Sequence, residues 1–417
     1  GDAQVFSTAA SYNADVYNFY RNWMKTFRVE QGEDGTLPTY APCYGAFGNS
    51  TSGALTGISW EGTIALVPYY LYRQTGRTEM IEENFDAMLR YMDYLAANPM
   101  KDARYLTGKT GPLADWLSVE MTNNGLVNNA MYVYLMDIIR EMAEVIGRDD
   151  IAAEYAERYE LTKQEWNDVY VDAETGIIGN KGKDTQTGYA TPLRFNVIAE
   201  ENLEQAIEYF VNTVVRADYT LKTGFSGTPA LLPMLTQYGY AEEAYKLFEQ
   251  TEYASWLYPV TQGATSVWER WNSYTVEGGF NGNNSMNSFN HFSLGAVTEW
   301  MMAYQLGIAP GDTAGYKEFI LQPTVGGSFS FVNGSFECDY GTIASGWTAE
   351  NGKLSSYSVT VPANTSATLY LPVSEEQATA MALPEGAAML GSDTHNGLNC
   401  ALFKLTAGSY TFTVPTE

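Results

Sequence analysis

The hydrophobic pattern of this chain changes its period near residue 309, and this change constrains the fold more than any other feature. Up to residue 308, apolar residues recur at spacings of three and four, as in helices with one buried face. From residue 309, apolar and polar residues alternate between Gly, Asn and Pro, as in short strands. The sequence therefore predicts a helical domain over 1–308 and a β domain over 309–417.

The helical period recurs in nine segments, and several are followed by Gly-containing turns such as the one in "YRQTGRTEMIEENF". Turns of this kind join consecutive antiparallel helices. The predicted helices are Ala9–Phe27, Gly62–Thr75, Met80–Ala97, Asn124–Ile146, Ala152–Val169, Asn202–Val215, Pro229–Tyr238, Ala241–Gln250 and Phe292–Leu306.

The C-terminal region, with segments such as "EFILQPTV" and "ALFKLTAGSYTFTVP", predicts roughly eight short strands in an antiparallel β-sandwich. Two of the three cysteines, Cys338 and Cys400, fall in this region. Their spacing leaves open whether they pair.

Composition narrows the range of ligands. The 49 acidic and 23 basic residues give a net charge of −26, which disfavours nucleic acid and anionic membranes as partners. Three cysteines and two histidines are too few for most metal centres, so we expect no cofactor and no structural metal. An oxygen-ligated calcium site stays open. The 14% of aromatic residues favours a carbohydrate, whose rings stack on flat side chains.

One carboxylate lies among large aromatic side chains in "TSVWERWNSY", where Glu269 stands between Trp268 and Trp271. A structural alternative is a buried glutamate held by Arg270 or by a backbone group. The functional interpretation is a carboxylate that apolar neighbours tune to act as a general acid or base.

Five further polar or aromatic candidates lie on predicted loops, where binding residues concentrate. Asp2 and Asp115 could instead cap helices, and Trp60 and Trp116 could belong to the core. His291 could be a satisfied structural histidine, but it follows Glu269 by only 22 residues in an amide-rich segment. Carboxylates and tryptophans on the loops of a helical domain suggest a glycoside hydrolase, which uses two carboxyl groups across the scissile bond.

Seven segments in the same order resemble the bacterial α-L-rhamnosidase family of inverting glycoside hydrolases. They include "GDAQVFSTAASYNADVYNFYRNWMK", "ADWLS", "LKTGFSGTPALLPML", "QTEYASWLYPVTQGATSVWERWNS" and "MNSFNHFSLGAVTEWM". The resemblance implies an (α/α)6 barrel of the six-hairpin glycosidase type, followed by the family's C-terminal β-sandwich.

The resemblance also implies roles for individual residues. Glu269 would be the general base that activates water for inversion at terminal α-L-rhamnose. Asp2, with Asp115, would stabilise positive charge in the transition state. The implied sugar-binding positions are Asp2, Trp60, Trp116, Trp271 and His291, with Asp115 added as a substrate-binding candidate.

Two departures from the family pattern qualify this expectation. The family usually has an aspartate two places after the tryptophan matching Trp60, whereas this chain has Gly62 there. The family's general acid belongs to a D-x-x-x-x-E-R-x-G-W segment upstream of G-D-A-Q. We therefore expect a barrel incomplete at its N-terminus, with about ten of its twelve helices present, and weak activity unless an upstream fragment docks.

Three hypotheses for function follow. The first is an α-L-rhamnosidase. The second is a related (α/α)6 glycosidase with another sugar specificity, and the third is a non-catalytic carbohydrate-binding homologue. The sequence does not indicate the compartment, the oligomeric state or the preferred linkage.

Overall fold

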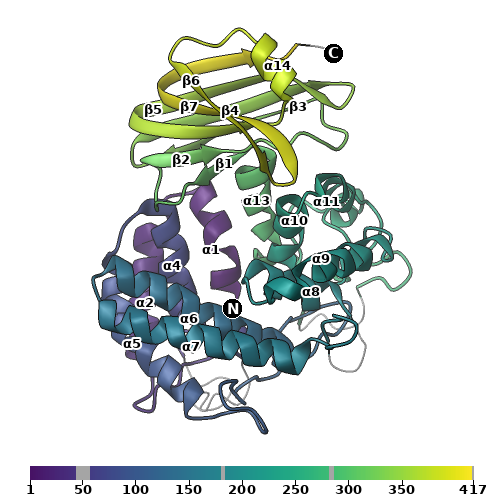
Figure 1. The fold of residues 1–417 in the computed structure, drawn as a ribbon. Helices are drawn as coiled ribbons and strands as arrows, with labels where there is room; N and C mark the ends of the chain where they lie inside the picture. The colour runs from purple at the N-terminus through teal and green to yellow at the C-terminus, as the bar shows by residue number, and fades with distance from the viewer. Residues whose placement is uncertain (44–56, 180–183, 281–285, 416–417) are drawn as a thin grey trace.

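The computed structural model describes residues 1–43, 57–179, 184–280 and 286–415, and it places a helical domain beneath a β domain (Figure 1). The last helical segment ends at Gln305 and the first strand begins at Ile308. The two kinds of secondary structure thus meet close to the change in hydrophobic period.

An inner ring of six helical segments forms the centre of the described helical domain. Each segment contacts the next one, and the last contacts the first. The ring consists of α1 (Asp2–Asn13), α4 (Thr63–Thr75), α6 (Asn124–Val145), α8 (Gln186–Arg194), α10 (Thr228–Gln237) and a continuous final segment of η3 (Ser293–Ala296), α13 (Val297–Trp300) and η4 (Met301–Gln305).

Five helices form an outer layer, and each follows an inner helix along the chain. They are α2 (Tyr17–Val29), α5 (Glu79–Ala96), α7 (Asp149–Tyr170), α9 (Glu200–Val215) and α11 (Ala241–Phe248), while the short α3 (Ile58–Glu61) and α12 (Leu257–Thr261) lie in connections. The predicted (α/α)6 type is confirmed. The described residues supply six inner and five outer helices, one more than the roughly ten that we expected.

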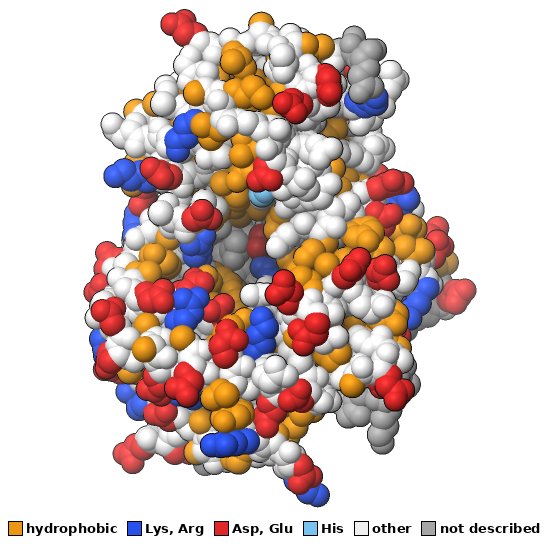
Figure 2. Space-filling view, in the orientation of Figure 1, with side chains coloured by type: hydrophobic (Ala, Val, Ile, Leu, Met, Phe, Trp, Pro, Cys, Tyr) orange, Lys and Arg blue, Asp and Glu red, His pale blue; other side chains and the backbone are white. Residues whose placement is uncertain are grey.

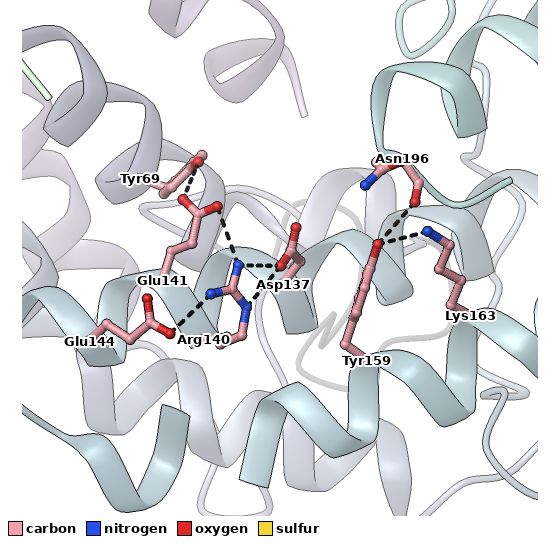
Figure 3. A network of polar contacts seen from close by, with 8 residues as sticks. All are labelled: Tyr69, Asp137, Arg140, Glu141, Glu144, Tyr159, Lys163 and Asn196. Atoms are coloured by element: carbon pink, nitrogen blue, oxygen red, sulfur yellow. Dashed lines mark hydrogen bonds and ion pairs between the residues drawn. The ribbon is translucent and has the colours of Figure 1, made fainter. Parts of the chain in front are cut away.

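Burial separates the two layers. Helix α2 buries Tyr17, Tyr20, Met24 and Phe27, which are three or four residues apart and so line one face. Helix α6 instead buries residues on every side, because it is surrounded by other helices. The inner helices are also joined by polar contacts: Tyr69 of α4 donates a hydrogen bond to Glu141 of α6 at 2.7 Å, beside an Arg140 network (Figure 3).

Two helix predictions were wrong. The segment Ala9–Phe27 is two helices, because Ala14 adopts an extended conformation between α1 and α2. Helix α8 was missed because its threonines, glycine and proline disfavour helix in isolation. Its burial within the inner ring overrides that preference.

All six inner helices run in the same direction, since each is followed by a return segment. Their C-terminal ends face the β domain: Tyr12 donates a hydrogen bond to the Ile308 carbonyl at 3.0 Å, and Tyr316 donates one to Gln74 at 2.8 Å. Their N-terminal ends face away from the β domain. None of the described helices combines the length and the apolar character that crossing a bilayer requires.

The described β domain contains seven strands in one hydrogen-bonded network, with the short helix α14 (Glu375–Ala380) beside it. The strands are β1 (Ile308–Pro310), β2 (Glu318–Leu321), β3 (Phe331–Cys338), β4 (Gly341–Glu350), β5 (Lys353–Leu371), β6 (Ala387–His395) and β7 (Leu398–Thr413). The seven strands of the described residues are close to the roughly eight expected, but β5 and β7 are long, so the prediction of short strands was wrong for these two.

The long strands β5 and β7 each belong to two layers. The register between them breaks between Val361 and Ser366. Before the break β5 pairs with β4, which pairs with β3; after it β5 pairs with β2, and the matching half of β7 pairs with β6. The rings of Phe403 and Phe412, from different halves of β7, lie 5.0 Å apart in the core between the layers.

Two details of the β domain concern the expected antiparallel sandwich and the question of cysteine pairing. Strand β2 runs parallel to β5. Cys338 and Cys400 are both free thiols, one partly buried and one buried.

Candidate active site

The segments that lead into the inner helices meet at the end of the barrel away from the β domain. The N-terminal end of α1 carries Asp2, and the C-terminal end of this 12-residue helix contacts the β domain. At about 1.5 Å per residue, the two ends are roughly 18 Å apart. Every predicted site residue lies in or beside one of these segments.

Glu269 lies in the first of two short segments that are joined by hydrogen bonds. Its backbone N–H donates to the Ser288 carbonyl at 2.9 Å, and the Ser288 N–H donates to its Oε2 at 2.8 Å. The residue is only 9% exposed, and no described residue donates a hydrogen bond to Oε1. One carboxylate oxygen is therefore fixed by the protein, while the other remains available as an acceptor.

Asp2 and His291 come together from opposite ends of the helical domain's sequence. His291 Nε2 lies 3.3 Å from Asp2 Oδ1, and the Ser293 hydroxyl donates to the same oxygen at 2.8 Å. The Ser293 N–H donates to His291 Nδ1 at 3.5 Å. Because Nδ1 accepts, the ring proton of a neutral His291 belongs on Nε2, facing Asp2.

His291 is also part of the segment pair that holds Glu269. Its backbone N–H donates to the Val267 carbonyl at 2.9 Å, two residues before Glu269. The structure therefore brings Asp2, His291 and Glu269 into one connected group.

Aromatic rings extend this group across the mouth of the barrel. Phe225 stacks on Trp60, with ring centroids 6.4 Å apart, and lies 5.4 Å from the His291 ring. The Trp271 indole donates to the Thr223 carbonyl at 2.8 Å and packs edge-on against Trp256. Trp60 and Trp271 are both buried and belong to the helical core, so Trp60 also has the structural role that we considered for it.

Asp115 holds a neighbouring loop from inside the protein. Its oxygens accept hydrogen bonds from the Thr187 hydroxyl at 2.5 Å and from the N–H groups of Gly224, Ser226 and Gly227 at 2.9–3.1 Å. These N–H groups lie just before α10, so Asp115 anchors the loop that leads into this helix. Burial raises the pKa of Asp115 above its ordinary value, although the four hydrogen bonds favour the carboxylate.

Trp116 is half-buried beside this loop, and its carbonyl accepts a hydrogen bond from the Phe225 N–H at 3.0 Å. A side chain at Gly224 would place its Cβ 2.1 Å from the same carbonyl. Only glycine therefore allows the Trp116 and Phe225 segments to approach so closely.

An apolar hollow of about 270 Å³ lies beside the Glu269 segment. Its walls include Trp256, Val267, Trp268 and Trp271, and Arg270 contributes a charged group. Among the described residues, no group of histidine, cysteine, aspartate and glutamate side chains is arranged to hold a metal ion. The hollow can hold a neutral ring against apolar walls, and neither Glu269 nor Asp2 is part of its lining.

Sequence reasoning missed Phe225, which joins Trp60 to His291. The residue lies within the quoted segment "LKTGFSGTPALLPML", but its only signal was an aromatic residue between two glycine-containing turns. Glu61 is buried and accepts a hydrogen bond from Tyr91 at 3.0 Å, so its polar group faces the barrel wall.

Comparison with protein families gives two consecutive matches. Residues 1–304 match the model of the bacterial α-L-rhamnosidase six-hairpin glycosidase domain, and residues 307–382 match that of the bacterial α-L-rhamnosidase C-terminal domain.

Individual relatives agree with these matches. An α-L-rhamnosidase of Formosa agariphila is 33% identical over 388 residues, covering 90% of this chain and 40% of the relative. The structure of Streptomyces avermitilis α-L-rhamnosidase complexed with L-rhamnose is 31% identical, with a TM-score of 0.87 over 99% of this chain and 38% of that one. That of the Aspergillus terreus enzyme is 26% identical, with a TM-score of 0.84 over 98% of this chain and 45% of that one. The chain thus spans about two-fifths of its curated relatives.

Proposed function

The chain belongs to the bacterial α-L-rhamnosidase family of six-hairpin glycosidases, and we propose that the intact protein hydrolyses terminal α-L-rhamnose from rhamnosides with inversion. The observation that carries this proposal is the position of Glu269. One of its oxygens is fixed by the Ser288 N–H, and Oε1 accepts no hydrogen bond from the described residues. A carboxylate held in this way can orient a water molecule and accept its proton.

In the proposed reaction, the water oxygen attacks the anomeric carbon and its proton passes to Glu269. The bond to the leaving oxygen breaks, and that oxygen takes a proton from a general acid. We propose that this acid comes from the upstream segment that the family resemblance implies, not from residues 1–417. The transition state has oxocarbenium character, which nearby carboxylates stabilise.

The remaining site residues would bind the sugar. We propose that Asp2 and His291 hydrogen-bond its hydroxyls and that Trp60, Trp116 and Trp271 form apolar walls. Both Asp115 oxygens accept hydrogen bonds from Thr187 and the segment before α10, so we propose that Asp115 positions Trp116 and Phe225 and does not contact the sugar.

The test is Glu269→Gln in the intact protein, assayed with an aryl α-L-rhamnoside. We expect kcat to fall by about 10²–10⁴-fold, as for loss of a general base. The matched control is Glu277→Gln, an exposed glutamate in the same segment, which should leave kcat unchanged. Near-normal hydrolysis by Glu269→Gln would refute the base assignment.

A second measurement tests inversion. NMR of the first product should show β-L-rhamnose before mutarotation, because water attacks the face opposite the leaving group. First release of the α-anomer would contradict the inverting mechanism. A panel of aryl glycosides with other sugars would distinguish a rhamnosidase from a related glycosidase of different specificity.

A further inference from the structure

A second cavity lies at the opposite end of the barrel, between the C-terminal ends of the inner helices and the β-sandwich. We call it the distal cavity. Its volume is about 780 Å³, and Figure 2 shows a hollow with basic and acidic side chains between the two domains. Its lining includes Tyr70, Arg194, Gln237, Glu299, Tyr304 and His395.

The distal cavity is separate from the candidate active site. Each inner helix contributes to it through its C-terminal half or its middle, for example Gln74 of α4 and Arg194 of α8. Asp2 lies at the N-terminal end of α1, and Glu269 lies in the connection that leads into η3. The β-sandwich covers this end without filling it, and Gln322 and His395 form the roof.

The charges in this cavity are paired. Arg194 donates to both Glu299 oxygens, at 2.8 and 3.0 Å, and also to the Pro229 carbonyl at 2.5 Å. Each of the two side chains is only 17% exposed. Arg73 is likewise engaged, because it donates to the carbonyls of Gly311 and Asp312. A cavity of this kind offers polar contacts but no unpaired charge to attract an ion.

The roof is polar and fixed. His395 Nε2 lies 2.6 Å from Gln322 Oε1, and the His395 ring stacks on Tyr370 at 3.8 Å. Burial lowers the pKa of His395, which keeps the imidazole neutral near pH 7. The Gln322 amide in turn donates to the Ala303 carbonyl at 2.9 Å.

Tyrosine rings and unused hydrogen-bonding groups complete the lining. Within the described residues, the Tyr304 hydroxyl has no hydrogen-bond partner, and the Gln237 amide is exposed at the rim. Tyr69 differs, because its hydroxyl is already bonded to Glu141 (Figure 3). The cavity thus combines apolar ring faces with neutral donors and acceptors.

We propose that the distal cavity is a non-catalytic binding site for a neutral saccharide. Sugars present hydroxyls to amides and paired charges, and apolar C–H faces to aromatic rings, which matches this lining. The volume is within the range of about 300–1,000 Å³ that is usual for small-molecule sites. This inference is independent of the proposed hydrolysis, since none of the residues used for it belongs to the candidate active site.

The test is calorimetric titration of the intact protein with L-rhamnose as the probe, compared in separate titrations with glycerol. The parent should bind two molecules of L-rhamnose. Gln237→Trp places a large ring at the exposed rim and should remove one of the two sites. Tyr304→Phe should weaken the same site by about 5–50-fold, the usual effect of one lost hydrogen bond.

The controls separate this result from a change in folding or in hydrolysis. Tyr209→Phe removes a hydroxyl that bonds the Thr175 carbonyl on the outer surface and should leave both sites intact. Hydrolysis of an aryl α-L-rhamnoside should be unchanged in Gln237→Trp. A single site in the parent that Gln237→Trp leaves intact, unchanged binding in both cavity variants, or equal affinity for glycerol would each overturn the proposal, whereas a single site that Gln237→Trp removes would support it and count against the active site alone.

Discussion

The two ends of the helical barrel are built from different interactions. At the end with the candidate active site, carboxylates accept hydrogen bonds from backbone N–H groups, as Asp115 does from Gly224 and Gly227. At the sandwich end, side chains pair with each other or with carbonyls, as Arg194 does with Glu299 and Pro229. The first end is therefore assembled from loops, and the second from helix termini covered by another domain.

The direction of the inner helices accounts for this difference. Six parallel helices point their partly positive N-termini toward one end and their partly negative C-termini toward the other. Asp2 lies in the first turn of α1, whereas Arg73 and Arg194 lie in the last turns of α4 and α8. The barrel thus favours carboxylates at the end where the proposed chemistry requires them.

The largest effect that we predict comes from breaking the pair at the sandwich end. Arg194→Met leaves Glu299 buried without its partner, which should lower the free energy of unfolding by about 3–5 kcal/mol. Urea denaturation followed by circular dichroism measures it. Hydrolysis per folded molecule should change little, because the pair is remote from Glu269.

The matched control replaces both members of the pair. Arg194→Met combined with Glu299→Met removes the unpaired charge and should recover most of the lost stability. If the double variant were as unstable as Arg194→Met alone, packing and not charge pairing would explain the loss.

A smaller effect is expected at the active-site end from Asp115→Asn. The amide can accept from fewer of the N–H groups before α10, so we expect a loss of about 2 kcal/mol in stability. Hydrolysis should also fall, because the Trp116 and Phe225 segments lose their anchor. Asp150→Asn, whose carboxylate is highly exposed, is the control and should change neither property.

The stability difference between the parent and Asp115→Asn should also depend on pH. Burial raises the native pKa of Asp115 above its ordinary value of 3.8, so the native state binds a proton more tightly than the unfolded state. The part of the stability that arises from this pKa shift is therefore fully present below pH 3.8 and is lost as the pH rises through the native pKa, while the hydrogen bonds that Asp115 accepts persist. The stability gap between parent and Asp115→Asn should thus be largest at acid pH; a gap that widened with rising pH would contradict the assignment.

Much of this architecture could be predicted from local pattern. The spacing of Met80, Phe85 and Met88 marks one buried helical face, and α5 forms there. Helix α8 could not be predicted in this way, because its stability comes from surrounding helices and not from its own residues. The sequence also did not indicate that β5 belongs to two layers. Apolar and polar residues keep alternating through the bend where the strand passes from one layer to the other.

The candidate site, too, has features that the sequence predicts and features that it does not. Glu269 and the tryptophans stand out in the sequence by residue type, and the family resemblance adds roles for them. The contact of Asp2 with His291 joins residues 289 positions apart, which no local pattern can reveal. The four hydrogen bonds to Asp115 likewise depend on how loops fold against each other.

The smallest effect that we predict concerns an ion pair joining the two domains at the surface. Arg77 pairs with Asp339 at 2.8 Å, and the two side chains are 36% and 53% exposed. Since water and salt screen exposed pairs, Arg77→Met should cost at most about 1 kcal/mol in the free energy of unfolding. The same urea measurement in about 1 M salt, where the Debye length is only about 3 Å, should reduce this cost further.

The control for this pair is Lys246→Met, which breaks an exposed pair with Glu242 inside a single helix. If Arg77 matters only as a surface charge, the two variants should behave alike. A loss in Arg77→Met several times larger and insensitive to salt would mean that its contact with the Tyr17 ring, 5.0 Å away within the helical domain, contributes more than the exposed ion pair.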